Sequence, residues 1–336
     1  MYQERKELYR KIEENRHSKV LAYVTGDKNG METQISTEVI DFLSDHLDVL
    51  FNQSRKISLI LYSRGGDVLA AWNIINLIRM FCDEFEVIIP RKALSSATLI
   101  SIGADTIIMT KQATLGPIDP SVGGPYNPTI NNGGQNVPLP VSVEDVAGFF
   151  ELATNEMKED ADMRLAFQSL VNNIHPLALG RVARSRSQIK KLASKLLKIH
   201  MNDQEQIDKI IEFLCSESGS HDYTINRREA ENDLGLPIER PSEELYNIIS
   251  KLYVDFRDEM DLRQRFSAPD ITVEPQVGYD ILRAFVESID GGADQFRSRG
   301  FFSLAPNLLG AGQPMQILPP QYIDQRTKEG WEHVSD

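Results

Sequence analysis

Short apolar runs alternate with longer amphipathic stretches through the first 110 residues of the chain. The runs are rich in Val, Ile, Leu and Tyr, which is typical of strands that are buried on both faces. The predicted strands are 19–25, 57–62, 86–90 and 106–110, and the predicted helices are 36–51, 68–81 and a short one that ends at Ala104. Strands that alternate with helices through short turns predict βαβ units and therefore a parallel sheet.

The segments on either side of this core are less regular. Residues 3–16 are strongly charged, and we expect a solvent-facing helix or a docking arm. Ser36 or Thr37 is a candidate N-cap for the first core helix. Residues 116–140 are rich in Gly, Pro and Asn, and a loop of this length is often a lid or a binding loop.

The remaining chain predicts helices at 142–170, 186–198, 241–256 and 278–289, with a short strand at 223–225, a helical turn at 228–234 and scattered strands near the end. The predicted organisation is a charged N-terminal helix (1–17), one α/β domain (18–254) and a C-terminal α+β extension (255–336) of unknown role.

Composition narrows the class of protein. The 336 residues are 41% apolar and 25% charged, close to the averages for globular chains. A formal net charge of −13 repels a phosphate backbone, so we expect no nucleic-acid partner. The start of the chain lacks the apolar run of a signal peptide, and no stretch is long enough to span a membrane. Cys82 and Cys215 are expected to be free thiols, which is consistent with the cytoplasm.

Two glycines follow the second predicted strand, in the run Ser63-Arg64-Gly65-Gly66. Ligands of a parallel sheet bind beyond the carboxyl ends of its strands, and glycines leave backbone N–H groups open to a ligand oxygen. Such donors are what an oxyanion hole requires. A tight turn that needs a positive φ angle explains the glycines equally well.

The next strand is followed by Ser95, which opens a helix. A serine is a weak nucleophile until a base accepts its proton, so Ser95 needs a partner. N-capping by Ser95 or Ser96 is the alternative. The two elements lie on consecutive βα units and should be adjacent in space. We expect no metal site, since no His/Cys pair stands at ligand spacing, and no cofactor, since no phosphate-loop motif accompanies the other glycines.

The ordered segments SRGGD, KALSSATLISIGADTIIM and ATLGPIDP resemble the serine dehydrogenase proteinase family of the Clp-protease and signal-peptide-peptidase superfamily. The resemblance covers about residues 18–240. It implies a ClpP/crotonase-like fold, in which a parallel sheet of repeated ββα/βαβ units is flanked by helices. It also implies a serine peptidase that acts on peptides or unfolded proteins, assembles as a homo-oligomer and is a candidate partner of an unfoldase. The loop 116–140 and the N-terminal helix are candidate contacts between copies.

By this resemblance Ser95 is the nucleophile, and Asp105, ten residues later, fixes that register over Ser96. Gly65 and Gly66 match the glycine pair that holds the oxyanion, with the Ser96 N–H as a second donor. The sequence departs from the family pattern twice. Arg64 replaces a proline, and Ala97 replaces a glycine, whose added methyl group would narrow the space for substrate.

The general base is not fixed by the resemblance. Our hypothesis is His221, with Asp119 or Asp222 to orient its imidazole. Lys158 and His175 are alternatives, although Lys158 lies in a charged run and His175 precedes Pro176, where a structural hydrogen bond is typical.

Three functions remain open at this stage. The first is a cytoplasmic serine peptidase, the second a peptidase-like scaffold that binds peptides or partner proteins without turnover, and the third an acyl-CoA enzyme of the crotonase type. The cleavage specificity and the size of the oligomer are not readable from the sequence.

Overall fold

An eight-stranded sheet forms the centre of the molecule, in the order β12-β5-β3-β2-β1-β13-β14-β15. The computed structural model describes residues 1–51, 53–118, 121–132, 135–157, 162–217, 223–268, 276–304 and 322–334. Neighbouring strands from β12 to β1 are parallel, and those from β1 to β15 are antiparallel. The predicted parallel sheet of an α/β protein is therefore confirmed.

Apart from β12, for which no strand was predicted, the parallel strands and the helices between them match the predicted elements closely. The strands are β1 (Lys19–Thr25), β2 (Lys56–Tyr62), β3 (Glu84–Ile89), β5 (Thr106–Met109) and β12 (Ile238–Glu239). The helices are α2 (Val39–Leu50), α3 (Val68–Phe81) and α4 (Ser96–Ile102). The N-cap of α2 is Glu38, whose side chain makes no capping hydrogen bond, so the predicted cap at Ser36 or Thr37 is wrong.

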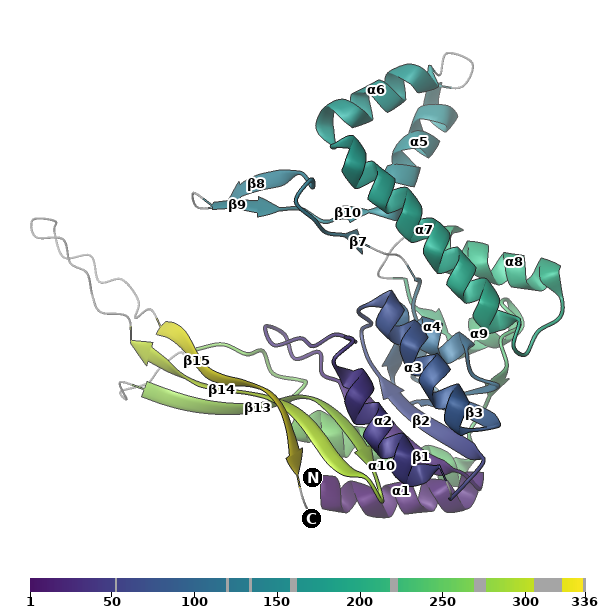
Figure 1. The fold of residues 1–336 in the computed structure, drawn as a ribbon, viewed down its shortest axis with the longest axis vertical. Coiled ribbons are helices and arrows are strands. Elements are labelled where there is room, and N and C mark those ends of the chain that lie inside the picture. The colour runs from purple at the N-terminus through teal and green to yellow at the C-terminus, as the bar shows by residue number, and fades with distance from the viewer. Residues whose placement is uncertain are drawn as a thin grey trace, which may run out of the picture.

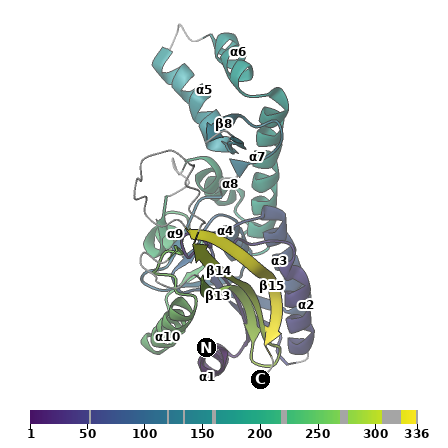
Figure 2. The same cartoon turned by 90° about the vertical axis from the view of Figure 1, so that its left-hand side faces the viewer.

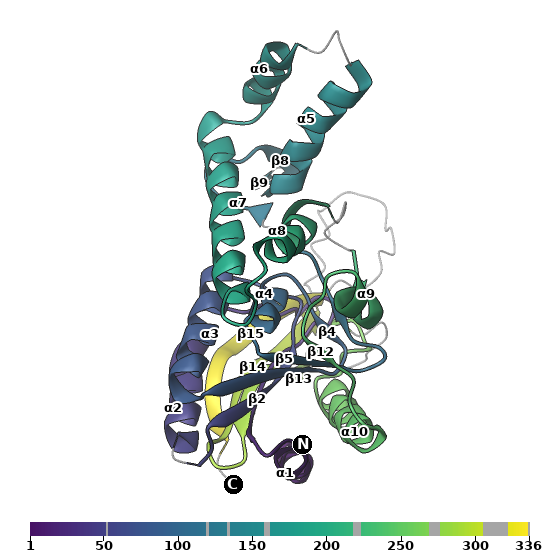
Figure 3. The same ribbon diagram turned by 90° about the vertical axis from the view of Figure 1, so that its right-hand side faces the viewer.

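Helices cover both faces of the sheet (Figure 3). On one face α2, α3 and α4 pack together with α8 (Gln204–Glu212). On the other face lie α1 (Tyr2–Arg16) and α10 (Glu243–Glu259). The predicted N-terminal helix is present as α1, but the expectation that it faces solvent is wrong, because Tyr9 and Ile12 are fully buried against the sheet.

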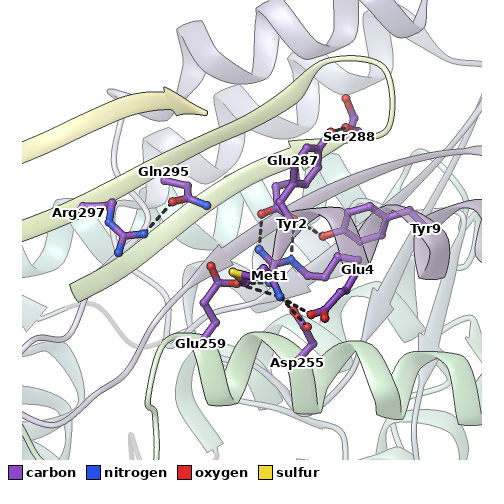
Figure 4. Close-up of polar contacts among 11 residues, drawn as sticks. Met1, Tyr2, Glu4, Tyr9, Asp255, Glu259, Glu287, Ser288, Gln295 and Arg297 are labelled. Carbon is purple, nitrogen blue, oxygen red and sulfur yellow. Dashed lines mark hydrogen bonds and ion pairs between the residues drawn. The ribbon is translucent and has the colours of Figure 1, made fainter. Parts of the chain in front are cut away.

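A buried ion network fastens α1 to elements far along the chain (Figure 4). Arg5 is fully buried and donates to Glu287 of β13 at 2.8 and 2.6 Å, and it also pairs with Asp255 and Glu259 of α10. Tyr9 donates to the same Glu287 carboxylate at 2.6 Å. A buried charge is tolerated only when it is paired in this way.

The C-terminal strands β13 (Gln276–Ser288), β14 (Gly292–Leu304) and β15 (Tyr322–Val334) extend the central sheet. The predicted helix at 278–289 is therefore wrong. A β-bulge at Arg283 leaves that residue out of the ladder and shifts the alternation of faces, so Leu282 and Phe285 lie in the same buried cluster. The proposed boundary at residue 254 stays a prediction, although α10 crosses it and β13 pairs with β1.

An arm made of β7–β10 and α5–α7 projects from the core (Figure 1). Its elements are β7 (Ser121–Val122), β8 (Thr129–Asn132), β9 (Gln135–Pro138), β10 (Val141–Ser142), α5 (Val143–Met157), α6 (Met163–Asn173) and α7 (Pro176–Leu197). The predicted loop 116–140 thus contains short strands, and the predicted helix 142–170 is two helices. In the described part of the chain no helix is long and apolar enough to cross a bilayer.

Candidate active site

The segment after β2 is the first part of the site. Ser63 forms a parallel bridge to Ala93 of β4 (Lys92–Ala93), and Gly66 forms one to Ile35. The Ser63 hydroxyl accepts the Gly65 N–H at 3.0 Å. Asp67 then caps α3 by accepting the Ala70 N–H at 2.7 Å. The turn is therefore fixed at both ends by hydrogen bonds.

Gly65 and Gly66 have φ angles of +102° and +151°, which L side chains rarely adopt. Space excludes a side chain as well. A Cβ on Gly65 would lie 2.7 Å from both the Leu94 carbonyl and the Ser95 Cβ, and one on Gly66 would lie 2.3 Å from the Ile35 carbonyl. The glycines let the turn after β2 pack directly against the turn that carries Ser95.

Ser95 lies between β4 and α4 with φ 54° and ψ −119°. A positive φ in a residue with a side chain marks local strain, which is common at functional sites. The Ser95 side chain makes no capping hydrogen bond to α4, so the N-capping alternative does not describe this serine. It is half-buried and lines a cavity.

Two backbone donors remain beside Ser95. The N–H groups of Gly66 and Ser96 have no acceptor among the described residues, whereas the Gly65 N–H is committed to Ser63. The Ser96 side chain is fully buried, and its hydroxyl also lacks a partner in that part of the chain. Of the three predicted oxyanion-hole residues, Gly66 and Ser96 are the ones with an available N–H.

A cavity of about 390 Å³ opens beside the nucleophile candidate. It is lined by Glu32, Thr33, Gln34, Arg64, Leu94, Ser95 and Tyr223. The three residues from the loop between β1 and α2 were missed in the sequence. The carboxyl end of β1 was the available signal, because loops at these ends of a parallel sheet form the binding edge. Ala97 is not among the lining residues; it is fully buried in the core, so its methyl group does not narrow this cavity.

Two of the three candidate bases, and both carboxylates proposed to orient His221, fall outside the described residues. Asp119, Lys158, His221 and Asp222 all lie there, so the structure places none of them. Tyr223, directly after Asp222, lines the cavity beside Ser95. The chain therefore passes the site immediately after the predicted base.

His175, the other candidate base, is placed far from Ser95. It caps the N-terminus of α7, where its Nδ1 accepts the Leu177 N–H at 3.2 Å, and its ring stacks on Tyr126 at 4.7 Å. α7 begins directly after His175, and Ile189, the first residue of α7 in the buried core that also contains α4, lies about 21 Å further along the helix. Within one chain the structure does not bring His175 to Ser95, and the structural hydrogen bond is the one observed.

A second serine, histidine and aspartate meet elsewhere in the fold. His46 of α2 contacts the Ser288 hydroxyl at 2.7 Å through Nδ1 and Asp294 at 3.1 Å through Nε2. His333 contacts the other Asp294 oxygen at 3.0 Å. Ser288 is fully buried and His46 is 1% exposed, so no substrate can reach them. This network joins α2 to the C-terminal strands.

A match to a known protein family covers the part of the chain that contains these glycines and serines. Residues 1–134 match the family of ClpP-like SDH-type serine proteinases. The predicted resemblance is confirmed over this range, which holds Gly65, Gly66, Ser95 and Ser96. Its extension toward residue 240, where His221 lies, stays a prediction.

Two curated relatives come from Methanocaldococcus jannaschii. The uncharacterized protein MJ0137 is 30% identical over 198 residues, 59% of this chain and 58% of the relative. The uncharacterized protein MJ1495 is 42% identical over 67 residues, 20% of this chain and 23% of the relative. The matches thus span less than two thirds of either relative.

Similar solved structures include ClpP1 from Listeria monocytogenes, with 16% identity, a TM-score of 0.37 and coverage of 71% of this chain and 99% of that chain. Another is a mutant of the 1510-N membrane-bound stomatin-specific protease, with 16% identity, a TM-score of 0.36 and coverage of 69% of this chain and 85% of that chain.

Proposed function

We propose that this chain is a serine peptidase that cleaves peptide bonds through an acyl-enzyme on Ser95. The observation that carries the proposal is the position of Ser95, strained at a strand-to-helix turn, in a cavity and against the glycine turn with open N–H donors. The match of residues 1–134 to a serine proteinase family supports the same chemistry.

In this mechanism the Ser95 hydroxyl attacks the carbonyl carbon of the scissile bond while the base accepts its proton. The N–H groups of Gly66 and Ser96 bind the oxyanion that forms. The base then gives the proton to the leaving amine, and water releases the acyl group by the reverse sequence. His221 is the proposed base, oriented by Asp119 or Asp222; the support is the position of Tyr223 in the cavity wall.

Self-association is part of the proposal. In the described chain half of the large apolar side chains that are exposed lie on the arm, among them Leu152, Leu165 and Phe167 at 60%, 69% and 53% exposure. Exposed apolar patches of this kind commonly mark interfaces. Peptides or unfolded proteins as substrates, an unfoldase partner and a cytoplasmic location remain predictions.

A peptidase-like scaffold is the competing function. It predicts that the protein binds peptides or partner proteins without turnover, and the feature of the sequence that favours it is Arg64, which replaces the proline of the family pattern. An acyl-CoA enzyme is the third candidate, and no described feature favours it. The scaffold and the peptidase differ in one testable property, the reactivity of Ser95.

The test is covalent labelling of the purified protein by a fluorophosphonate probe, measured by intact mass. We expect one adduct on the native protein, none on Ser95→Ala, and an undiminished adduct on Ser187→Ala, which removes an exposed serine of α7. Loss of the adduct in His221→Ala would assign the base, and its loss only in Lys158→Ala would assign the lysine instead. A folded native protein that is not labelled would exclude the peptidase and leave the scaffold.

A further inference from the structure

The polar residues that line the Ser95 cavity differ in whether they already have hydrogen-bond partners. Three of them have a partner within the chain. Glu32 accepts the Gly30 N–H at 3.1 Å, the Thr33 hydroxyl lies 3.1 Å from the donating Arg283 Nε, and Tyr223 donates to Glu229 at 2.5 Å. These groups hold the walls in place and have less capacity left for a ligand.

Arg64 differs from these three residues. Its side chain is exposed, it lines the cavity, and it makes no hydrogen bond or ion pair with any residue of the described chain. It is also the only cation among the lining residues that the structure describes. The Gly66 and Ser96 N–H groups are donors as well. The acceptors that line the cavity, the Glu32 carboxylate and the Gln34 amide oxygen, belong to the loop between β1 and α2, so Arg64 is the charged donor that the glycine turn offers to a ligand.

The backbone holds Arg64 at this position. It directly follows Ser63, which is bridged to β4, and it precedes Gly65, which is pressed against Ser95. The Cα of Arg64 is thus fixed one residue from the glycine pair, while its long side chain can reach along the cavity wall. A guanidinium group donates in a planar fork that matches a carboxylate.

We propose that Arg64 is a specificity-determining residue that binds a substrate carboxylate in the Ser95 cavity. The proposal rests on the proposed peptidase function and names its substrate class: peptides with an acidic side chain near the scissile bond or with a free C-terminal carboxylate. Both sources present the same chemistry to the guanidinium. A lysine or arginine in the same position would be repelled by Arg64.

The test measures binding apart from turnover, in the Ser95→Ala protein, by the fluorescence anisotropy of labelled peptides. Three peptides share one sequence with Glu, Gln or Lys at the centre and an amidated C-terminus, and a fourth has Gln at the centre and a free C-terminus. We expect the Glu peptide or the free-terminus peptide to bind about tenfold more tightly than the amidated Gln peptide, since a charged hydrogen-bonded pair contributes about one such factor. Which of the two gains identifies the source of the carboxylate.

Substitutions of Arg64 decide whether this residue is the cause. Arg64→Ala should abolish the preference, and Arg64→Glu should reverse it in favour of the Lys peptide. Arg55→Glu is the matched control, because Arg55 precedes β2 at the end opposite Arg64 and pairs with Asp83 on the surface. A preference that survives Arg64→Ala, or the absence of any preference, would overturn the proposal.

Labelling of Ser95 separates this inference from the proposed function. An Arg64-dependent preference in a protein whose native Ser95 does not react would retain the carboxylate site and reject the peptidase. A reactive Ser95 without an Arg64-dependent preference would retain the peptidase and reject the carboxylate site.

Discussion

Ser95 is held in a conformation that destabilises the folded chain. With φ 54° and ψ −119° it occupies a region in which a residue with a Cβ is strained by about 1–3 kcal/mol. Such strain persists only where the surrounding structure imposes it, here the bridge of Ser63 to Ala93 and the contact with Gly65.

Ser95→Gly should therefore raise the free energy of unfolding by about 1 kcal/mol while abolishing the fluorophosphonate adduct. Ser95→Ala keeps the Cβ and should leave stability close to that of the native protein. Urea denaturation of the three proteins measures this. A glycine variant that is less stable than the alanine variant would mean that the turn is not strained.

Gly65→Ala should reduce labelling of Ser95 and destabilise the protein by roughly 1–3 kcal/mol, because the new methyl group would stand 2.7 Å from the Ser95 Cβ. Gly148→Ala on α5 is the matched control, since nothing lies within 4 Å of its Cβ position. That change should stabilise α5 by up to about 1 kcal/mol. Equal effects of the two substitutions on labelling would contradict the close packing of the glycine turn.

The sequence shows which residues are candidates for the site better than it shows which residues they contact. Gly65, Gly66 and Ser95 could be found because strand ends and glycine pairs are local signals. The cavity walls from 32–34 could not, because they come from a loop whose position depends on the Ile35 bridge to Gly66. His175 was a candidate base by its chemistry alone, and the length of α7 removes it from the site.

The ends of helices and strands are likewise predictable where a local pattern sets them and unpredictable where pairing with a distant strand sets them. The helix α3 (Val68–Phe81) and the strand β1 (Lys19–Thr25) agree with the prediction at both ends, because their apolar periodicity reports burial directly. The strand β13 was read as a helix because its bulge at Arg283 interrupts the alternation of apolar and polar residues. The bulge is set by pairing with β14, which periodicity does not report.

The elements α3, β3 and β5 are tied together by one carboxylate. Asp105, directly before β5, accepts two hydrogen bonds from Arg79 of α3 at 2.9 Å each and one from the Phe85 N–H of β3 at 2.8 Å. Burial by itself would raise the pKa of Asp105, but these donors favour the charged form more strongly and hold its pKa below the usual value.

Asp105→Asn should thus lower the free energy of unfolding by about 1 kcal/mol at pH 7. A carboxyl group whose pKa is lowered on folding stabilises the protein above its unfolded pKa, near 4, and loses that contribution as the pH falls through its folded pKa. The difference between the native and variant proteins should accordingly shrink below about pH 4. Denaturation curves from pH 3 to 7 measure it, and a constant difference would contradict the assigned cause.

At the scale of the whole molecule, Arg5 joins α1 to α10 and β13. Arg5→Met leaves the fully buried Glu287 without its cation, which should cost about 3–5 kcal/mol of folding free energy. Arg5→Met combined with Glu287→Met should recover much of that loss. Arg10→Met on the same helix is the control, since Arg10 pairs with Glu7 on the surface and its loss should change stability by less than about 0.5 kcal/mol. Similar losses in the two single variants would argue against a buried network.

The pairing of β1 with β13 also determines when the sheet can close during synthesis. Residues 22–25 pair with residues 284–287, so the edge of β1 stays open until more than 250 further residues have been synthesised and β13 has left the ribosome. An unpaired strand edge is a site at which growing chains can join one another. The parallel strands can thus pair with one another before β13 is available to pair with β1. The nascent chain is therefore more vulnerable to aggregation than the finished protein.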